Sequence, residues 1–259
     1  MELGIRGKTA LVTGAGRGLG KAIALELAAE GVNIIACSRG EAGLESLMQE
    51  LHQGHHSFIS LDLSSIDAPK NVIRQVKNSV GCPDIIVNNV GGNLGYTDPL
   101  GPVSEWREVM RLNVEVAIEI NQAFIPEMQK KKWGRICHIS SIAALENQGP
   151  PSYCAAKLAL NAYVRSLGRY VSRDNVILTS VMPGAVYTDG GYWDDARQNR
   201  PEHVEKYLRE RMAIQRFGTV EEISKAVTFM CSEHASFCVG SCLLIDGGQG
   251  RVFHQGEDT

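Results

Sequence analysis

The chain has 259 residues, of which 44% are hydrophobic and 21% are charged, with a formal net charge of -3. This is an ordinary globular composition, and it gives no electrostatic footprint for nucleic acid. No apolar run reaches the roughly 18 residues that a membrane span needs, so we expect no membrane partner. The seven cysteines are odd in number and form no CxxC pair, which favours a reducing cytoplasm over a disulfide framework. Cys238 and Cys242 have a spacing that metal ligands can have, but the sequence shows no second pair of ligands to complete a site. We therefore expect no metal site.

Short apolar runs alternate with helix-like segments along the whole chain. The predicted strands are 9–13, 33–37, 57–61, 84–88, 135–140, 176–181 and 242–245. The predicted helices are 19–30, 41–53, 66–79, 104–130, 151–172 and 219–232. Thr219 and Glu222 have the spacing of a capping box at the start of the last helix.

This alternation predicts an α/β fold with about seven parallel strands joined by right-handed crossovers. The strands are apolar along their length, as in a sheet that helices cover on both faces. We therefore expect a Rossmann-type doubly wound sheet with its ligands at the carboxyl ends of the strands. No linker divides the sequence, so residues 1–259 are expected to form a single domain.

The first predicted strand runs into a glycine-rich stretch, "TGAGRGLG" at residues 13–20, that opens the first predicted helix. Gly14, Gly18 and Gly20 give the pattern T-G-x-x-x-G-x-G. Glycines let the backbone approach a pyrophosphate, and a helix N-terminus offers free N–H groups to it. The position and composition of the loop predict a dinucleotide site.

The second predicted strand ends in Ser38 and Arg39, where an NAD-binding unit usually carries an acidic residue for the ribose 2′-hydroxyl. A guanidinium can bind a 2′-phosphate that a carboxylate would repel. Arg17 in the glycine loop adds a second cation nearby. We predict a preference for NADP(H), with NAD(H) as the alternative cofactor.

Tyr153 and Lys157, in "YCAAK", lie four residues apart on a predicted helix and therefore on one face of it. A nearby ammonium favours the phenolate form and lowers the pKa of a tyrosine. The pair is a candidate general acid or base.

With these motifs in place, the chain resembles the short-chain dehydrogenase/reductase family over almost its full length. The matching stretches, in order, are "TGAGRGLG", Asp62 in "LDLS", "NNVG" (88–91), Asn113 in "RLNV", "ISS" (139–141), "YCAAK", "PGAVYT" (183–188) and "IDGG" (245–248). The resemblance is to NADP(H)-preferring members similar to 3-oxoacyl-(acyl-carrier-protein) reductases. It implies an oxidoreductase that acts on CH–OH groups.

The resemblance also implies a catalytic set. Tyr153 would be the general acid or base, and Lys157 would bind the nicotinamide ribose and lower the pKa of Tyr153. Ser141 would hydrogen-bond the substrate oxygen, and Asn113 would anchor a water chain. Ser140 is a rival to Ser141, because it restores the usual separation from the tyrosine; strand alternation favours Ser141.

The remaining residues implied by the family lie along the cofactor. The full predicted contact set is Gly14, Arg17, Gly18, Leu19, Gly20, Ser38, Arg39, Asp62, Leu63, Asn89, Val90, Gly91, Tyr153, Lys157, Pro183, Gly184, Val186 and Thr188.

Two residues depart from the family pattern. Val90 replaces a usual alanine and makes the cofactor wall bulkier. His138 is an unusual polar residue in the fifth strand, and we interpret it as a core histidine with its hydrogen bonds satisfied rather than as a second base.

Residues 189–215, called the lid below, are expected to be a mobile segment over the substrate, with Tyr192 and Trp193 as an apolar wall. A second glycine- and proline-rich loop, 91–103, lies near the same mouth. Two substrate classes stay open, a 3-oxoacyl thioester on an acidic carrier or a small polar ketone, sugar or alcohol. Carrier docking would use the basic residues Lys130, Lys131, Lys132 and Arg173.

A dinucleotide-binding regulator or scaffold without catalysis is the alternative from a different class, although such relatives usually lose the tyrosine or the lysine. Family members assemble through two long helices and the C-terminal strand, which implies a homotetramer, or a homodimer. Residues 251–259 are expected either to pack across such an interface or to fray.

Overall fold

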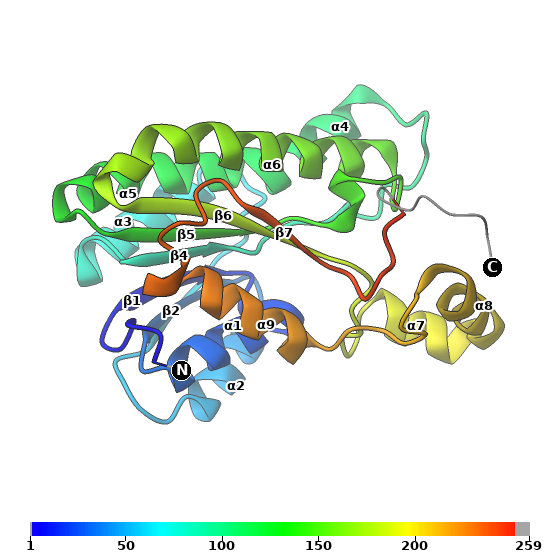
Figure 1. Cartoon of the computed structure of the whole chain (residues 1–259), viewed down its shortest axis with the longest axis horizontal. Helices are drawn as coiled ribbons and strands as arrows, with labels where there is room; N and C mark the ends of the chain where they lie inside the picture. The colour runs from blue at the N-terminus through cyan, green and yellow to red at the C-terminus, as the bar shows by residue number, and fades with distance from the viewer. Residues whose placement is uncertain (1, 252–259) are drawn as a thin grey trace.

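The computed structural model describes residues 2–251, and its centre is one parallel sheet (Figure 1). The strand order is β3-β2-β1-β4-β5-β6-β7. The strands are β1 (Thr9–Thr13), β2 (Asn33–Ser38), β3 (Ser57–Ser60), β4 (Ile85–Asn88), β5 (Gly134–Ile139), β6 (Val176–Pro183) and β7 (Cys242–Ile245). Every predicted strand forms, and the predicted α/β class is confirmed. The prediction for 251–259 falls almost entirely outside the described residues.

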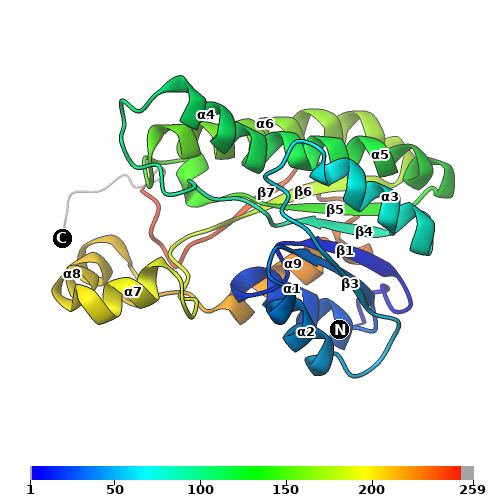
Figure 2. The ribbon, with the colours of Figure 1, turned by 180° about the vertical axis from the view of Figure 1, so that it is seen from behind.

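Helices cover both faces of the sheet (Figures 1 and 2). The helices are α1 (Gly18–Ala29), α2 (Glu41–Glu50), α3 (Ala68–Val80), α4 (Val103–Met110), α5 (Val116–Lys131), α6 (Pro151–Val171), α7 (Tyr192–Asn199), α8 (Pro201–Arg211) and α9 (Val220–Met230). The ribbon shows α1, α2 and α9 on one face, and α3, α5 and α6 on the other. Within residues 2–251, no helix is both long enough and apolar enough to cross a bilayer.

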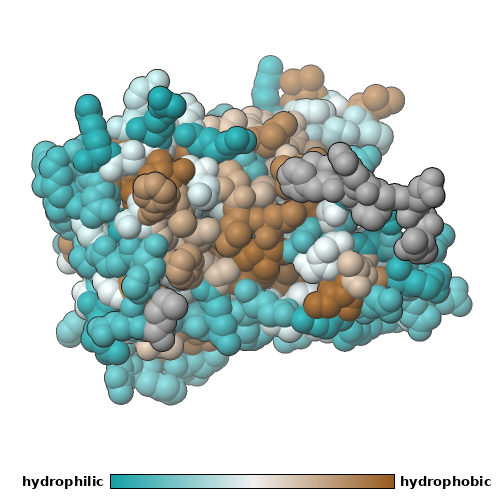
Figure 3. Space-filling view, viewed as in Figure 1, coloured by the Kyte–Doolittle hydropathy of each residue, from teal (hydrophilic) through white to brown (hydrophobic). Residues whose placement is uncertain are grey.

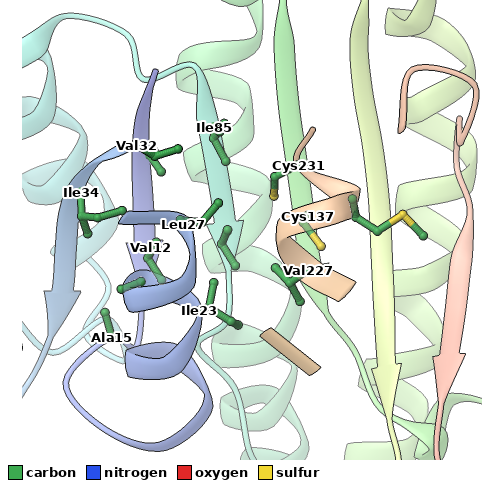
Figure 4. Packing of buried hydrophobic residues seen from close by; sticks show 14 of the residues in the cluster. Val12, Ala15, Ile23, Leu27, Val32, Ile34, Ile85, Cys137, Val227 and Cys231 are labelled. Atoms are coloured by element: carbon green, nitrogen blue, oxygen red, sulfur yellow. The ribbon is translucent and has the colours of Figure 1, made fainter. Parts of the chain in front are cut away.

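The core forms because helix and strand periodicities present apolar faces to each other. Ile23 and Leu27 lie one turn apart on α1 and pack with Val227 of α9 against the sheet, as Figure 4 shows. All four residues of β4 and all six of β5 are buried. Full burial of one such aliphatic side chain contributes about 1.5–3 kcal/mol, so these central strands fix the position of their ends firmly.

The strand order reverses between β1 and β4, and a threonine fastens the two strand ends there. Thr13 donates from Oγ1 to the carbonyl of Val87 at 3.3 Å and accepts from the N–H groups of Asn89 at 3.0 Å and Val90 at 3.2 Å. The crevice at such a reversal is where doubly wound sheets bind their ligands. The edge of the sheet at which we expect the ligand to bind is therefore formed by the carboxyl ends of β1, β2 and β4.

Most of the lid forms two helices, α7 and α8, which the sequence analysis did not list. Pro201 occupies the first turn of α8, where its missing N–H costs no hydrogen bond. The lid has an apolar centre of its own, in which Trp193 packs on Tyr207 and Phe217 at ring distances of 4.3 and 4.7 Å. Trp193 thus stabilises the lid from within, whereas the Tyr192 side chain is exposed.

Candidate active site

A cavity of about 500 Å³ opens at the carboxyl ends of β1, β2 and β4. The predicted cofactor residues that line it are Gly14, Arg17, Gly18, Leu19, Gly20, Ser38, Arg39, Asp62, Leu63, Asn89, Val90, Gly91 and Thr188. Further lining residues that the sequence did not single out are Leu61, Ser64, Gly92, Asn93, Leu94, Gly95, Leu112, Asp189, Gly190 and Gly191. They lie in the loop 91–103, in the lid, or beside the predicted residues Asp62, Leu63 and Asn113, so the sequence indicated their segments but not the individual residues.

Glycine is required in the phosphate loop for two different reasons. Gly14 has a φ of 69° and Gly18 a φ of 53°, a left-handed region that side chains disfavour. A Cβ atom on Gly20 would lie 2.1 Å from the carbonyl oxygen of Gly14. Arg17 is the extended N-cap of α1, and its side chain caps nothing, so the first N–H groups of α1 face the cavity mouth. This geometry suits a pyrophosphate.

The end of β2 carries the groups expected to select the 2′-phosphate. Ser38 lies directly against the glycine loop, since a Cβ on Gly16 would be 2.7 Å from its Oγ. The Arg39 side chain is 70% exposed, and its Nη1 is 3.9 Å from Oδ2 of Asp62. A long, exposed pair of this kind contributes little stability, so Arg39 can turn towards a phosphate at small cost.

Lys157 lies one turn after Tyr153 on α6 and is buried. Its ammonium donates to the carbonyl of Ile139 at the end of β5, at 2.8 Å. The same Nζ lies 5.6 Å from the centre of the Tyr153 ring. The predicted shared face of the helix is present, and the pair stands beside the carboxyl end of the central strand.

The direction of the tyrosine shift differs from the expectation. Burial raises the pKa of Tyr153 above its ordinary value, and a hydrogen bond with Ser141 opposes that effect. Burial also lowers the pKa of Lys157 to about 8, because a low-dielectric surrounding disfavours its charge. At neutral pH the phenol is therefore protonated and most of the lysine is cationic.

Asn113 stands next to this pair, in a π-helical turn, Arg111–Glu115, that joins α4 to α5. Its Nδ2 donates to the carbonyls of Gly92 and Val109, each at 2.8 Å, and its Oδ1 accepts from the N–H of Gly92 at 3.0 Å. A Cβ on Gly91 would lie 2.6 Å from Oδ1 of Asn113 and 2.8 Å from Nζ of Lys157. The side-chain amide of Asn113 and the ammonium of Lys157 thus lie together behind Gly91, which lines the cavity.

The two candidate serines face opposite ways, as adjacent strand residues do. Ser140 is buried, and its hydroxyl donates to the backbone carbonyl of Lys157 at 3.3 Å. Ser141 is only half-buried, accepts from the N–H of Ala143 at 3.1 Å and lies close enough to Tyr153 to lower the pKa of its phenol. The structure therefore brings Ser141, and not Ser140, to the tyrosine.

His138 has the satisfied hydrogen bonds that the sequence interpretation required. Nε2 contacts Nδ2 of Asn121 at 2.9 Å, and Nδ1 contacts the carbonyl of Thr179 at 3.1 Å. Burial is the main cause that lowers its pKa to about 4. The prediction of a neutral core histidine is confirmed.

Five predicted cofactor contacts are not among the residues that line this cavity: Tyr153, Lys157, Pro183, Gly184 and Val186. Pro183 ends β6 in the buried interior. A Cβ on Gly184 would meet Asp246 and Gln249 rather than the cavity. Val186 pairs with Gly218 and packs on the core below the sheet. For Pro183, Gly184 and Val186 the role of cofactor contact stays a prediction.

The basic residues considered for carrier docking lie at the opposite, amino edge of the sheet, and each has an acidic partner. Lys130 pairs with Glu127 at 2.6 Å, and Lys131 lies 3.8 Å from Asp84. Lys132 and Arg173 both contact Asp174, at 2.5 and 3.9 Å. This surface therefore lies at the end of the sheet opposite to Tyr153.

Comparisons with known proteins agree with this architecture. A family model described as short chain dehydrogenase matches residues 8–199. The chain is 32% identical over 249 residues to the 3-oxoacyl-(acyl-carrier-protein) reductase of Pseudomonas aeruginosa, covering 95% of this chain and 98% of that protein.

Solved structures are similar over the same length. A 3-oxoacyl-(acyl-carrier-protein) reductase from Agrobacterium tumefaciens with NADP bound has a TM-score of 0.89 at 31% identity, covering 95% of this chain and 96% of that one. L-sorbose reductase from Gluconobacter frateurii, complexed with NADPH and L-sorbose, has a TM-score of 0.89 at 28% identity, covering 96% and 98%.

Proposed function

Because the chain belongs to the short-chain dehydrogenase family, we propose that it transfers hydride between NADP(H) and a ketone or secondary alcohol through Tyr153, Lys157 and Ser141. The observation that carries the proposal is the meeting of Lys157 and Asn113 beneath Gly91, at the wall of the cavity. A pocket that held a dinucleotide only for regulation would not need a buried ammonium beside a half-buried phenol.

The protonation states support a reduction. NADPH supplies the hydride to the carbonyl carbon, and the oxygen then needs a proton. Tyr153 is protonated at neutral pH, because burial raises its pKa, and can donate that proton. Ser141 hydrogen-bonds the same oxygen and stabilises developing charge. Lys157 holds the nicotinamide ribose. Asn113 anchors the water chain that returns a proton to Lys157.

NADP(H) is the preferred cofactor in this proposal. Arg17 and Arg39 both line the cavity, and Arg39 is largely exposed beside the end of β2. Similarity to two solved reductases with NADP or NADPH bound supports the same preference.

For the substrate, we favour a small polar ketone or the matching alcohol, delivered beneath the lid. The acidic partners of Lys130, Lys131 and Lys132 neutralise the surface that a carrier protein would need. Similarity to L-sorbose reductase fits this class. A 3-oxoacyl thioester is the second candidate, supported by the similarity to 3-oxoacyl-(acyl-carrier-protein) reductases.

A screen of NADPH oxidation with an acetoacetyl thioester, ketose sugars and cyclic ketones separates the two substrate classes. The preferred substrate then serves to compare Ser141→Ala with Ser140→Ala. We expect loss of turnover for Ser141→Ala and retention for Ser140→Ala; the reverse pattern would contradict the assigned role of Ser141. Cofactor binding without turnover on the whole panel, unchanged in Tyr153→Phe, would favour the regulator alternative.

We also propose that the chain forms a homotetramer, or a homodimer, in the cytoplasm. Figure 3 shows apolar side chains gathered on the face that carries β7, where Phe237 is 98% exposed and Val239 and Leu243 are partly exposed. An exposed edge strand with apolar neighbours is a surface that association would cover. Light scattering that shows a monomer at micromolar concentration would contradict this assembly.

A further inference from the structure

Gln249 is a buried amide that joins three parts of the chain. It lies in residues 246–251, called the strap below, which follow β7. Its Oε1 accepts from the N–H of Ala185 at 2.8 Å, beyond the end of β6. Its Nε2 donates to the hydroxyl of Tyr207 on α8 at 2.6 Å and to Oε1 of Gln148 at 3.3 Å. The side chain is only 3% exposed, so these contacts are shielded from water.

Gln148 belongs to a short segment, residues 145–150 (the flanking loop), that leads into α6 and its tyrosine. A Cβ on Gly149 would lie 3.2 Å from Cδ1 of Tyr153, so the loop backbone passes close to the phenol ring. The N–H of Cys154 bonds the carbonyl of Pro150 at 3.0 Å. A displacement of the flanking loop is therefore transmitted to Tyr153.

The strap is held to the lid and to the flanking loop by further contacts. On the lid side, the N–H of Ile214 bonds the carbonyl of Gly247 at 3.2 Å, and Nη2 of Arg251 donates to the carbonyl of Glu210 at 2.9 Å. On the other side, the N–H of Arg251 donates to Glu146. The strap thus joins the lid to the flanking loop, and Figure 1 shows it in red running from the α7–α8 region towards the layer that holds α6.

We propose that Gln249 is a positioning residue that couples the docking of the lid to the position of Tyr153. The two hydrogen bonds that its Nε2 donates, to Tyr207 and Gln148, hold α8 and the flanking loop at a fixed distance from each other. The hydrogen bond that its Oε1 accepts from Ala185 anchors both to the end of β6. The inference rests on the proposed role of Tyr153 as the proton donor. Its consequence is that substrate held by the lid and the reacting phenol keep a common geometry.

A hydrogen–deuterium exchange experiment on the full-length protein tests the coupling without any substrate. Gln249→Met keeps the volume of the side chain but removes all three contacts. We expect faster exchange both in the peptide 145–152 and in the peptide 203–212. The matched control is Gln198→Met, because Gln198 bonds Asp194 within α7 at 3.0 Å, and neither peptide should change. Faster exchange in one peptide alone, or in neither, overturns the proposal.

Kinetics provide a second test with single-contact variants. Gln249→Met should lower kcat/KM for the carbonyl substrate about 10- to 100-fold, since small misplacements of reacting groups cost that much. The dissociation constant for NADPH should stay within about twofold, which corresponds to only about 0.4 kcal/mol. A parallel loss of NADPH affinity would show a general structural defect and would overturn the assigned role.

Tyr207→Phe removes the lid contact of Gln249. Gln148→Met removes its flanking-loop contact, together with the 3.5 Å hydrogen bond from Nε2 of Gln148 to Glu146 inside that loop. Each should reproduce part of the loss, and neither should add to Gln249→Met, because all three act through the same side chain. Additive effects contradict the coupling. If Tyr153→Phe proves fully active, the proposed function fails, while the exchange result still decides whether Gln249 joins the two regions.

Discussion

The cofactor end and the substrate end of this site are built from different kinds of contact. The cofactor cavity is formed mainly by turns at the ends of β1, β2, β3 and β4, whose backbones the sheet fixes directly, and the first residues of the lid, 189–191, complete its wall. The lid stands outside the sheet, with its own aromatic centre, and reaches the rest of the chain through contacts such as Gln249. Changes at one end should therefore alter cofactor use, and changes at the other should alter carbonyl turnover, with Tyr153 at the junction.

The largest expected effect is at that junction. Tyr153→Phe removes the proton donor and should lower kcat about 10²- to 10⁴-fold, the usual contribution of general acid catalysis. NADPH should bind as before, as measured by isothermal titration calorimetry. Loss of cofactor binding together with turnover would show that the two ends are not separable at this residue.

Gly20→Ala should impair the cofactor end alone. The added methyl group would lie 2.1 Å from the carbonyl oxygen of Gly14, so the loop backbone must shift. Overpacking of this kind costs about 1–3 kcal/mol, and a loop displaced from its binding geometry by that amount should lower NADPH affinity about 5- to 150-fold. The control is Gly40→Ala, where no atom lies within 4 Å of the added group. Equal NADPH affinity for both variants would contradict the steric argument.

Arg39→Glu should change which cofactor is used rather than how fast the carbonyl reacts. Losing a charge-assisted hydrogen bond to the 2′-phosphate costs about 1.5 kcal/mol, or about tenfold in kcat/KM with NADPH. The kcat/KM with NADH should stay the same or rise. If NADH supports equal or better turnover than NADPH in the unmodified protein, the predicted preference is wrong.

The smallest effect concerns the core between the two ends. The pKa of His138 is about 4 in the fold, against 6.5 ordinarily, so the unfolded chain binds more protons between these values. Stability is therefore lost as the pH falls through this window, by about 1 kcal/mol between pH 7.5 and 5.5. Thermal unfolding of His138→Gln should show a flatter pH dependence. The control His52→Gln, at an exposed position, should keep the pH dependence of stability that the unmodified protein shows. The same pH dependence in the unmodified protein, His138→Gln and His52→Gln would contradict the role given to His138.

Patterns that repeat within a few residues could be predicted from the order of the amino acids. The seven strands, the glycine loop and the one-turn spacing of Tyr153 and Lys157 follow from backbone periodicity and from the sterics of glycine. The predicted helix 104–130 is instead α4, a π-helical turn and α5, and α7 and α8 were not predicted. The capping box at Thr219 and Glu222 also forms as expected. Strand alternation favoured Ser141 over Ser140, and the two side chains do face opposite ways.

Other features depend on residues that only the folded chain brings together. The pKa of Tyr153 is set first by burial, so the local tyrosine–lysine spacing gave the wrong direction of shift. Gln249 meets partners 42, 64 and 101 residues away, and no local pattern marks such contacts. The sequence by itself determined the layered sheet and the motif-bearing turns, because short-range sterics and periodicity specify them. The tertiary structure decided the burial of Tyr153, the packing of the lid and the contacts of the strap with the lid and the flanking loop. These features arise from surfaces that meet only after the sheet has formed.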